Sequence, residues 1–173
     1  LEIPLSNQGS PHPTKSIIFR ADPDNVSGLI YAGIDVVSLA NNHILDYMEP
    51  AMIQTKNVLN QAGILHSGAG MNSYEAYLPA FKSLKGQTIA FISSSDRTGQ
   101  YNNYQPYLNA GVNKAGFAYT TPYYLKQQIQ SVKDIVDLVV VEMHAGSEYS
   151  YSPSLNYDSY IPMEDFADLK INP

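Results

Sequence analysis

Residues 34 to 46 contain the sequence feature that most constrains the fold, a short apolar run that ends abruptly in polar side chains. The run extends from Ile34 to Leu39 and is rich in β-branched residues, and the polar segment Asn41 to His43 follows after one alanine. Runs of this kind fit a strand that is buried on both faces. Open α/β sheets place their ligand sites at the carboxyl ends of such strands. The segment therefore predicts an α/β sheet with a site where this strand ends.

Helical and strand patterns alternate along the rest of the chain. The predicted helices lie between Asp22 and Gly33, from residue 52 to residue 62, and from Pro122 to residue 136. The other predicted strands cover residues 16–19, 64–66, 80–84, 88–92 and 137–143, the last one buried, and residues 93–119 are predicted to form a long loop. This alternation indicates a layered α/β domain with parallel pairings and one antiparallel hairpin. Residues 150–173 show no periodicity and are predicted to form an irregular tail.

Composition excludes several classes of function. Charged residues make up 15% of the 173 residues and the formal net charge is −6, so the chain has no basic footprint for nucleic acid or anionic lipid. Cysteine is absent, which excludes disulfides, zinc-thiolate sites and a thiol nucleophile. No run reaches the roughly 20 apolar residues that a membrane helix needs.

Polar side chains follow two of the predicted buried strands. Asn41, Asn42 and His43 follow one strand and His144 follows the other, which predicts that they share one rim of the sheet. Imidazole nitrogen and amide and carboxylate oxygens suit zinc, manganese or iron, which can clamp a phosphoryl or carboxyl oxygen and lower the pKa of a bound water. A second interpretation stays open, in which the two asparagines form an Asx turn and His43 is satisfied by backbone groups.

The segment Asp35 to His43, with Asp46 behind it, resembles the central motif of the CapA/PgsA family of bacterial surface proteins associated with poly-γ-glutamate capsule synthesis. The other matching segments are Leu1-Glu2 with Pro4, Phe19-Arg20-Ala21-Asp22-Pro23, Ala62-Gly63-Ile64 with Gly68-Ala69-Gly70, and His144-Ala145-Gly146-Ser147-Glu148-Tyr149. That family is similar to calcineurin-like metallophosphoesterases. The resemblance implies a layered α-β-β-α sandwich, of which this chain forms part.

The resemblance also implies a role for each matching residue. Glu2, Asn42 and His144 match metal ligands, with Glu2 as a bridging carboxylate. His43 matches the imidazole that contacts or protonates the leaving group, and Asp46 would orient His43. The implied cofactor is a divalent metal, namely manganese, zinc or iron.

Two further residues are implied as substrate contacts. Asn41 lies in the central motif and Glu148 in the last matching segment.

The chain departs from the family pattern at several points. The phosphoesterase pattern begins with a strand that ends in Asp and closes with a Gly-His-x-His segment, and this sequence contains neither. Met48 stands where the family usually has Gly, and Ala145 replaces its Trp. We therefore expect residues 1–173 to form a single but incomplete domain of this type.

The resemblance implies two classes of function. The first is a metal-dependent hydrolase or ligase accessory in capsule biosynthesis, with the capsule polymer or its precursor and a membrane synthase complex as partners. It would act at the bacterial cell surface, anchored through a segment outside this chain. The second is a non-catalytic surface module that binds an anionic polymer or a protein through the same rim and its tyrosine-rich loops. Tyrosines such as those from Tyr101 to Tyr124 can stack on a sugar or polymer, or can simply pack the loops.

Metal titration tests the expected incomplete ligand set. Calorimetric titration of manganese or zinc into this chain is expected to show weak binding or none, because the matched ligands fill only part of a coordination shell. Tight one-to-one binding would contradict this expectation.

Overall fold

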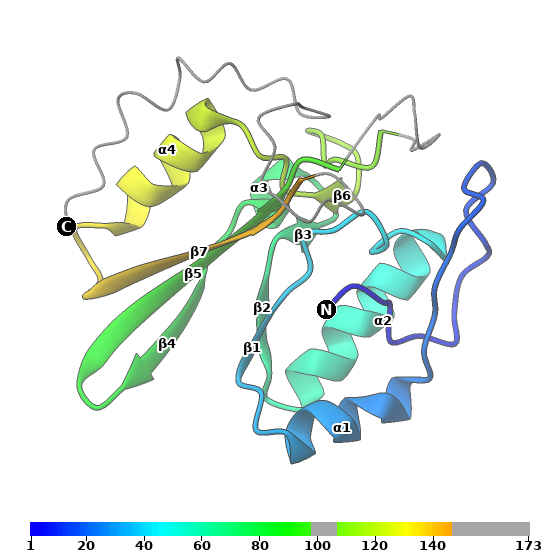
Figure 1. The fold of residues 1–173 in the computed structure, drawn as a ribbon, viewed down its shortest axis with the longest axis horizontal. Coiled ribbons are helices and arrows are strands. Elements are labelled where there is room, and N and C mark those ends of the chain that lie inside the picture. The colour runs from blue at the N-terminus through cyan, green and yellow to red at the C-terminus, as the bar shows by residue number, and fades with distance from the viewer. Residues whose placement is uncertain (98–106, 147–173) are drawn as a thin grey trace.

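The structure is a computed structural model, and it describes residues 1–97 and 107–146 (Figure 1). Its elements in chain order are η1 (Pro23–Asn25), α1 (Val26–Tyr31), β1 (Val36–Ser38), α2 (Met48–Gln61), β2 (Leu65–Ser67), β3 (Ala69–Gly70), α3 (Ser73–Ala76), β4 (Ala80–Leu84), β5 (Gln87–Ser95), β6 (Gly116–Phe117), α4 (Pro122–Val132) and β7 (Leu138–His144). The predicted helices and the predicted hairpin are all present.

The elements form four layers in the order helix, sheet, sheet, helix (Figure 1). Helix α4 packs against the three-stranded sheet β4-β5-β7. The parallel pair β1-β2 forms the next layer, where β2 contacts β4 and β5. Helices α1 and α2 lie on the outer side of this pair. The predicted α/β class and layer order are thus confirmed.

Strand pairing determines where the polar rim forms. Strands β5 and β7 run parallel, and their register ends with Ser95 opposite His144. Strands β1 and β2 also run parallel, and their register ends with Ser38 opposite Ser67. The polar residues that follow β1 and the end of β7 therefore meet at one edge of the sandwich, although they are far apart in sequence.

Gly68 lies where the two sheet layers approach closely. Its φ is +95°, and a Cβ at this position would lie 2.7 Å from the Ala40 Cβ and 2.8 Å from the Ser93 Cβ. Beside it, the hydroxyls of Ser67 and Ser93 form a hydrogen bond of 2.7 Å between the layers. Only glycine combines this backbone angle with this separation, so Gly68 permits the two layers to pack.

Apolar clusters pack the helices against the sheets. Helix α2 buries Met52, Thr55 and Leu59 completely, which is the face that the helical spacing predicts. The Thr55 hydroxyl donates to the Ala51 carbonyl of its own helix at 2.8 Å, so its burial leaves no donor unpaired. A separate cluster joins α4 to β5 and contains Leu125, Val132, Ala90 and Ile92. A buried Leu or Met stabilises the fold by about 1.5 to 3 kcal/mol.

Residues 137–143 were predicted to form a buried strand, and the predicted burial is wrong. Strand β7 forms where it was expected, but Leu138 is 53% exposed and Met143 is 50% exposed. Within the described residues β7 pairs only with β5, so it is an edge strand. Helix α4 covers the face that carries Val139 and Val141, and the apolar run by itself does not show whether one face or both are covered.

The predicted strand at residues 16–19 is also wrong. This segment is irregular, and the Phe19 amide donates to a side-chain oxygen of Asp46 at 2.6 Å. A side-chain carboxylate therefore takes the place of a strand partner. The predicted loop is shorter at its start, because β5 continues to Ser95 and buries Ser93, Ser94 and Ser95.

No helix in residues 1–97 or 107–146 is both long and apolar enough to cross a bilayer.

Met48 begins α2 with a φ of +62°, a left-handed angle that favours glycine. Replacing it with glycine should relieve this strain, so we expect Met48→Gly to raise the free energy of unfolding by about 1 kcal/mol. Urea unfolding measures the change. The matched control is Glu49→Gly, an exposed neighbour without a positive φ, which should lose about 0.5 to 1 kcal/mol. Equal losses in both variants would contradict this account of Met48.

Candidate functional site

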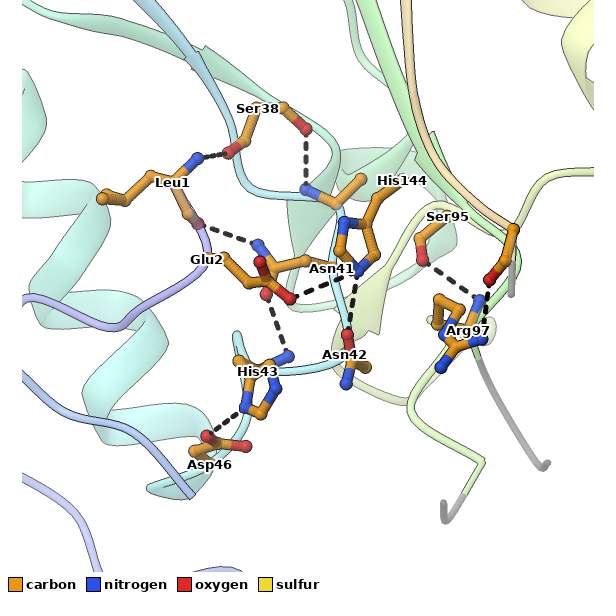
Figure 2. Close-up of polar contacts among 12 residues, drawn as sticks. Leu1, Glu2, Ser38, Asn41, Asn42, His43, Asp46, Ser95, Arg97 and His144 are labelled. Atoms are coloured by element: carbon orange, nitrogen blue, oxygen red, sulfur yellow. Dashed lines mark hydrogen bonds and ion pairs between the residues drawn. The ribbon is translucent and has the colours of Figure 1, made fainter. Parts of the chain in front are cut away.

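The loop after β1 is shaped by the side chain of Asn41. Its Oδ1 accepts a hydrogen bond from the His43 amide at 2.9 Å, which closes an Asx turn, and its Nδ2 donates to the Leu1 carbonyl at 2.8 Å (Figure 2). Asn41 is only 3% exposed. Both polar ends of its side chain therefore bind backbone groups, and the structure gives Asn41 a role in positioning His43 and the N-terminal segment.

His43 is held by the carboxylate of Asp46. Its Nδ1 lies 2.6 Å from the Asp46 Oδ2, and its ring packs against Phe19 with centroids 4.3 Å apart. Because a carboxylate oxygen accepts, Nδ1 carries the hydrogen and Nε2 is left with the lone pair. Within the described part of the chain, no hydrogen bond engages the His43 Nε2. The arrangement suits a histidine that exchanges a proton through Nε2.

Asp46 is completely buried and is neutralised by Lys15. The Lys15 Nζ contacts the Asp46 Oδ1 and also donates to the Asn42 carbonyl, and its side chain is 1% exposed. Burial lowers the pKa of Lys15, while the hydrogen bond and the charge of Asp46 raise it. Nothing in the sequence indicated Lys15, because it belongs to an irregular segment 31 residues before Asp46.

The three predicted metal ligands converge beside this histidine. Figure 2 shows Glu2, Asn42 and His144 pointing toward one another from three separate segments. The His144 Nε2 lies 3.0 Å from the Asn42 Oδ1 and 3.5 Å from the Glu2 Oε1. The structure thus brings together residues that are 102 positions apart in the sequence.

These three donors fit a divalent metal in their chemistry. Nε2 donates its hydrogen to the amide oxygen in this arrangement. In the other neutral tautomer the hydrogen lies on Nδ1, and a divalent cation could then bind here because Nε2 and the two oxygens would all offer lone pairs. Imidazole, amide and carboxylate suit manganese, zinc or iron. Among residues 1–97 and 107–146, however, no group of three or more His, Cys, Asp or Glu side chains is placed to hold a metal. The fit therefore depends on the Asn42 amide as one of three ligands.

The environment of His144 favours its neutral form. Burial lowers the pKa of His144, and the nearby Arg97 and His43 lower it too, whereas Glu2 and Asp96 raise it. A neutral imidazole is the form that binds a metal.

Arg97 is a buried cation near this rim that the sequence did not single out. It is 3% exposed, its guanidinium donates to the Gly146 carbonyl at 2.8 Å, and its amide donates to the Ser95 hydroxyl at 3.1 Å (Figure 2). Its contact with Gly146 joins the ends of β5 and β7. Glu148, the other predicted substrate contact, lies outside the described residues.

The fold and the site define a class of protein: an α/β sandwich whose strand ends bring histidine, amide and carboxylate groups to one rim. The chain belongs to the family of bacterial capsule synthesis proteins PGA_cap, whose family model matches residues 1–160. This confirms the resemblance that the sequence motifs carry.

Two curated relatives support the same family. The chain is 29% identical over 144 residues to the capsule biosynthesis protein CapA of Bacillus anthracis, covering 81% of this chain and 34% of that protein. It is 27% identical over 141 residues to the PGA biosynthesis protein CapA of Bacillus subtilis (strain 168), covering 81% of this chain and 36% of that protein. The chain therefore spans little more than a third of the length of these relatives.

A solved structure from Staphylococcus aureus, described as a 5′-nucleotidase in complex with alpha-ketoglutarate, also aligns with the chain. The TM-score is 0.45 and the identity is 17%, over 78% of this chain and 28% of that chain.

The buried pair of Lys15 and Asp46 predicts a large effect on stability. Lys15→Met should lower the free energy of unfolding by about 3 kcal/mol, because it leaves the Asp46 carboxylate buried without its cation. Lys133→Met is the matched control, since Lys133 pairs with Asp134 at the surface and should change stability by less than about 0.5 kcal/mol. Urea unfolding compares the two variants. Similar small effects in both would show that Lys15 does not neutralise Asp46.

Proposed function

We propose that the rim formed by Glu2, Asn42, His43, Asp46 and His144 is part of a metal-dependent hydrolytic site that acts on a capsule polymer or its precursor. The observation that carries this proposal is the convergence of the His144 Nε2 with the Asn42 and Glu2 oxygens, at 3.0 and 3.5 Å. Membership of a capsule synthesis family supports the choice of substrate class. A metallophosphoesterase-like reaction is the form of hydrolysis that this set of residues suits best.

Glu2, Asn42 and His144 would hold the metal, with further ligands supplied by segments outside the described residues. Manganese, zinc or iron would supply Lewis acidity toward a phosphoryl or carboxyl oxygen of the substrate.

His43 would move the proton. Its Nδ1 is fixed on Asp46, so its Nε2 carries the reactive lone pair. The Asp46 carboxylate stabilises the imidazolium that forms when Nε2 takes up a proton, and this imidazolium can then protonate a leaving group. Lys15 balances the charge of Asp46 and is too deeply buried to contact a substrate.

The charge distribution supports a metal rather than a basic patch as the group that attracts an anionic polymer. The net charge is −6, and among the described residues the cations near the rim are Lys15 and Arg97, which are both buried. A long-range attraction for an anion therefore needs an added cation.

The proposal extends to location and partners. We propose that the protein acts at the bacterial cell surface and would be attached there through a segment outside this chain, a location that membership of a capsule synthesis family supports. The capsule polymer or its precursor is the proposed substrate, and a membrane synthase complex is the proposed partner.

A non-catalytic surface module that binds an anionic polymer is the second candidate. The observation that favours it is the absence, within the described ranges, of a full metal-holding group of His, Cys, Asp or Glu side chains.

Hydrolysis of p-nitrophenyl phosphate esters by the full-length protein separates the two candidates. With manganese present, we expect His43→Ala to lower kcat about 100-fold or more, because it removes the residue that transfers the proton.

His66→Ala is the matched control. His66 is hydrogen-bonded to Asn60 at 3.1 Å and is not one of the proposed rim residues, so this variant should keep the wild-type rate. Equal background rates in the wild type and His43→Ala would favour the binding module. Poly-γ-glutamate binding that survives chelation of the metal would point the same way.

A further inference from the structure

A second feature of the molecule is a groove of about 650 Å³ between α3 and α4, near β6. Its aromatic residues are Tyr74, Tyr77, Tyr119 and Tyr124. A volume of this size matches small-molecule sites, which range from about 300 to 1,000 Å³. The groove is separate from the rim of Glu2, Asn42 and His144, because no residue lines both.

The tyrosines of the groove divide into a fixed base and exposed rings. The Tyr77 hydroxyl donates to the Tyr119 carbonyl at 2.9 Å and accepts from the Tyr119 amide at 3.0 Å, so Tyr77 is locked in place. The Tyr124 ring packs on it with centroids 5.1 Å apart but remains 45% exposed. Tyr74 is 79% exposed. The exposed rings of Tyr74 and Tyr124 provide flat surfaces for a ligand.

The polar lining of the groove carries no formal charge. Among the described residues that form it, the polar side chains other than tyrosine are amides and hydroxyls, from Ser73, Asn109, Gln127, Gln128 and Ser131. A polyanion such as poly-γ-glutamate would find no cation here. Amides and hydroxyls instead match the mixed donors and acceptors of sugar hydroxyls.

Gln128 lies in the wall of the groove and is hydrogen-bonded to its base. Its Nε2 donates to the Tyr77 carbonyl at 3.0 Å, whereas its Oε1 is buried without a hydrogen-bond partner in the described structure. Gln128 is only 8% exposed. Gln128 therefore contributes to the groove by holding Tyr77 in place.

We propose that this groove binds a neutral oligosaccharide. The exposed rings of Tyr74 and Tyr124 stack on the apolar faces of pyranose rings, while the amides and hydroxyls bond their hydroxyl groups. The backbone of β5 links the groove to the rim. Its last residue, Ser95, pairs with Tyr119 of the groove and also with His144 of the rim. A glycan of the cell envelope bound here would hold the rim close to the surface where capsule polymer is made.

Titration with chitotetraose and cellotetraose tests this inference. We expect the wild-type protein to bind at least one of these sugars, as measured by saturation-transfer NMR and calorimetry. Tyr74→Ala and Tyr124→Ala should each weaken binding about tenfold, the typical loss for one aromatic contact. Tyr74→Phe should keep most of the affinity, because it retains the ring.

Tyr31→Ala is the matched control. Tyr31 is 95% exposed on α1, away from the groove, and its loss should leave sugar binding unchanged. Thermal unfolding monitored by circular dichroism establishes that each variant is folded. Absence of binding to both sugars would overturn the inference. So would equal weakening by Tyr31→Ala, or groove variants that reduce binding of poly-γ-glutamate but not of the sugars.

Discussion

The burial of the Asp46 carboxylate is the constraint on which the rest of the site depends. A completely buried carboxylate must be paired, and Asp46 accepts from Lys15, from the Phe19 amide and from His43. These contacts tie the irregular N-terminal segment to the loop after β1, and they fix which nitrogen of His43 is free. One buried charge thus organises both the local backbone and the candidate proton-transfer residue.

Packing of the two sheet layers provides the second half of the site. Gly68 lets the β1-β2 layer approach β5, and β5 carries β7 beside it, so that His144 reaches Asn42. The rim is therefore a product of layer packing, and no single element contains it. The tyrosine-lined groove lies on the other side of the end of β5, which makes this strand end the structural link between the two candidate sites.

Much of the fold could be predicted from local patterns, and the failures have physical reasons. Helices α2 and α4 and the β4-β5 hairpin follow from periodicity and turn residues, which act within a few positions. The burial of β7 could not be predicted, because an apolar run does not show how many faces are covered. The segment 16–19 has strand-forming residues, but its backbone bonds to the side chain of Asp46 instead. At Met48 the sequence was informative. The family pattern has Gly at this position, and the structure gives Met48 a positive φ, which favours glycine.

For the site, the sequence by itself determined the family and the residues that meet at the rim, because a contiguous motif carries Asn42, His43 and Asp46 and a second motif carries His144. Only the tertiary structure decided how those residues are used. Asn41 binds backbone groups, Lys15 neutralises Asp46, and tyrosines from α3 and α4 line a common groove. Local sequence fixes side-chain chemistry and strand ends, whereas burial and pairing depend on segments that approach one another only when the two sheets pack.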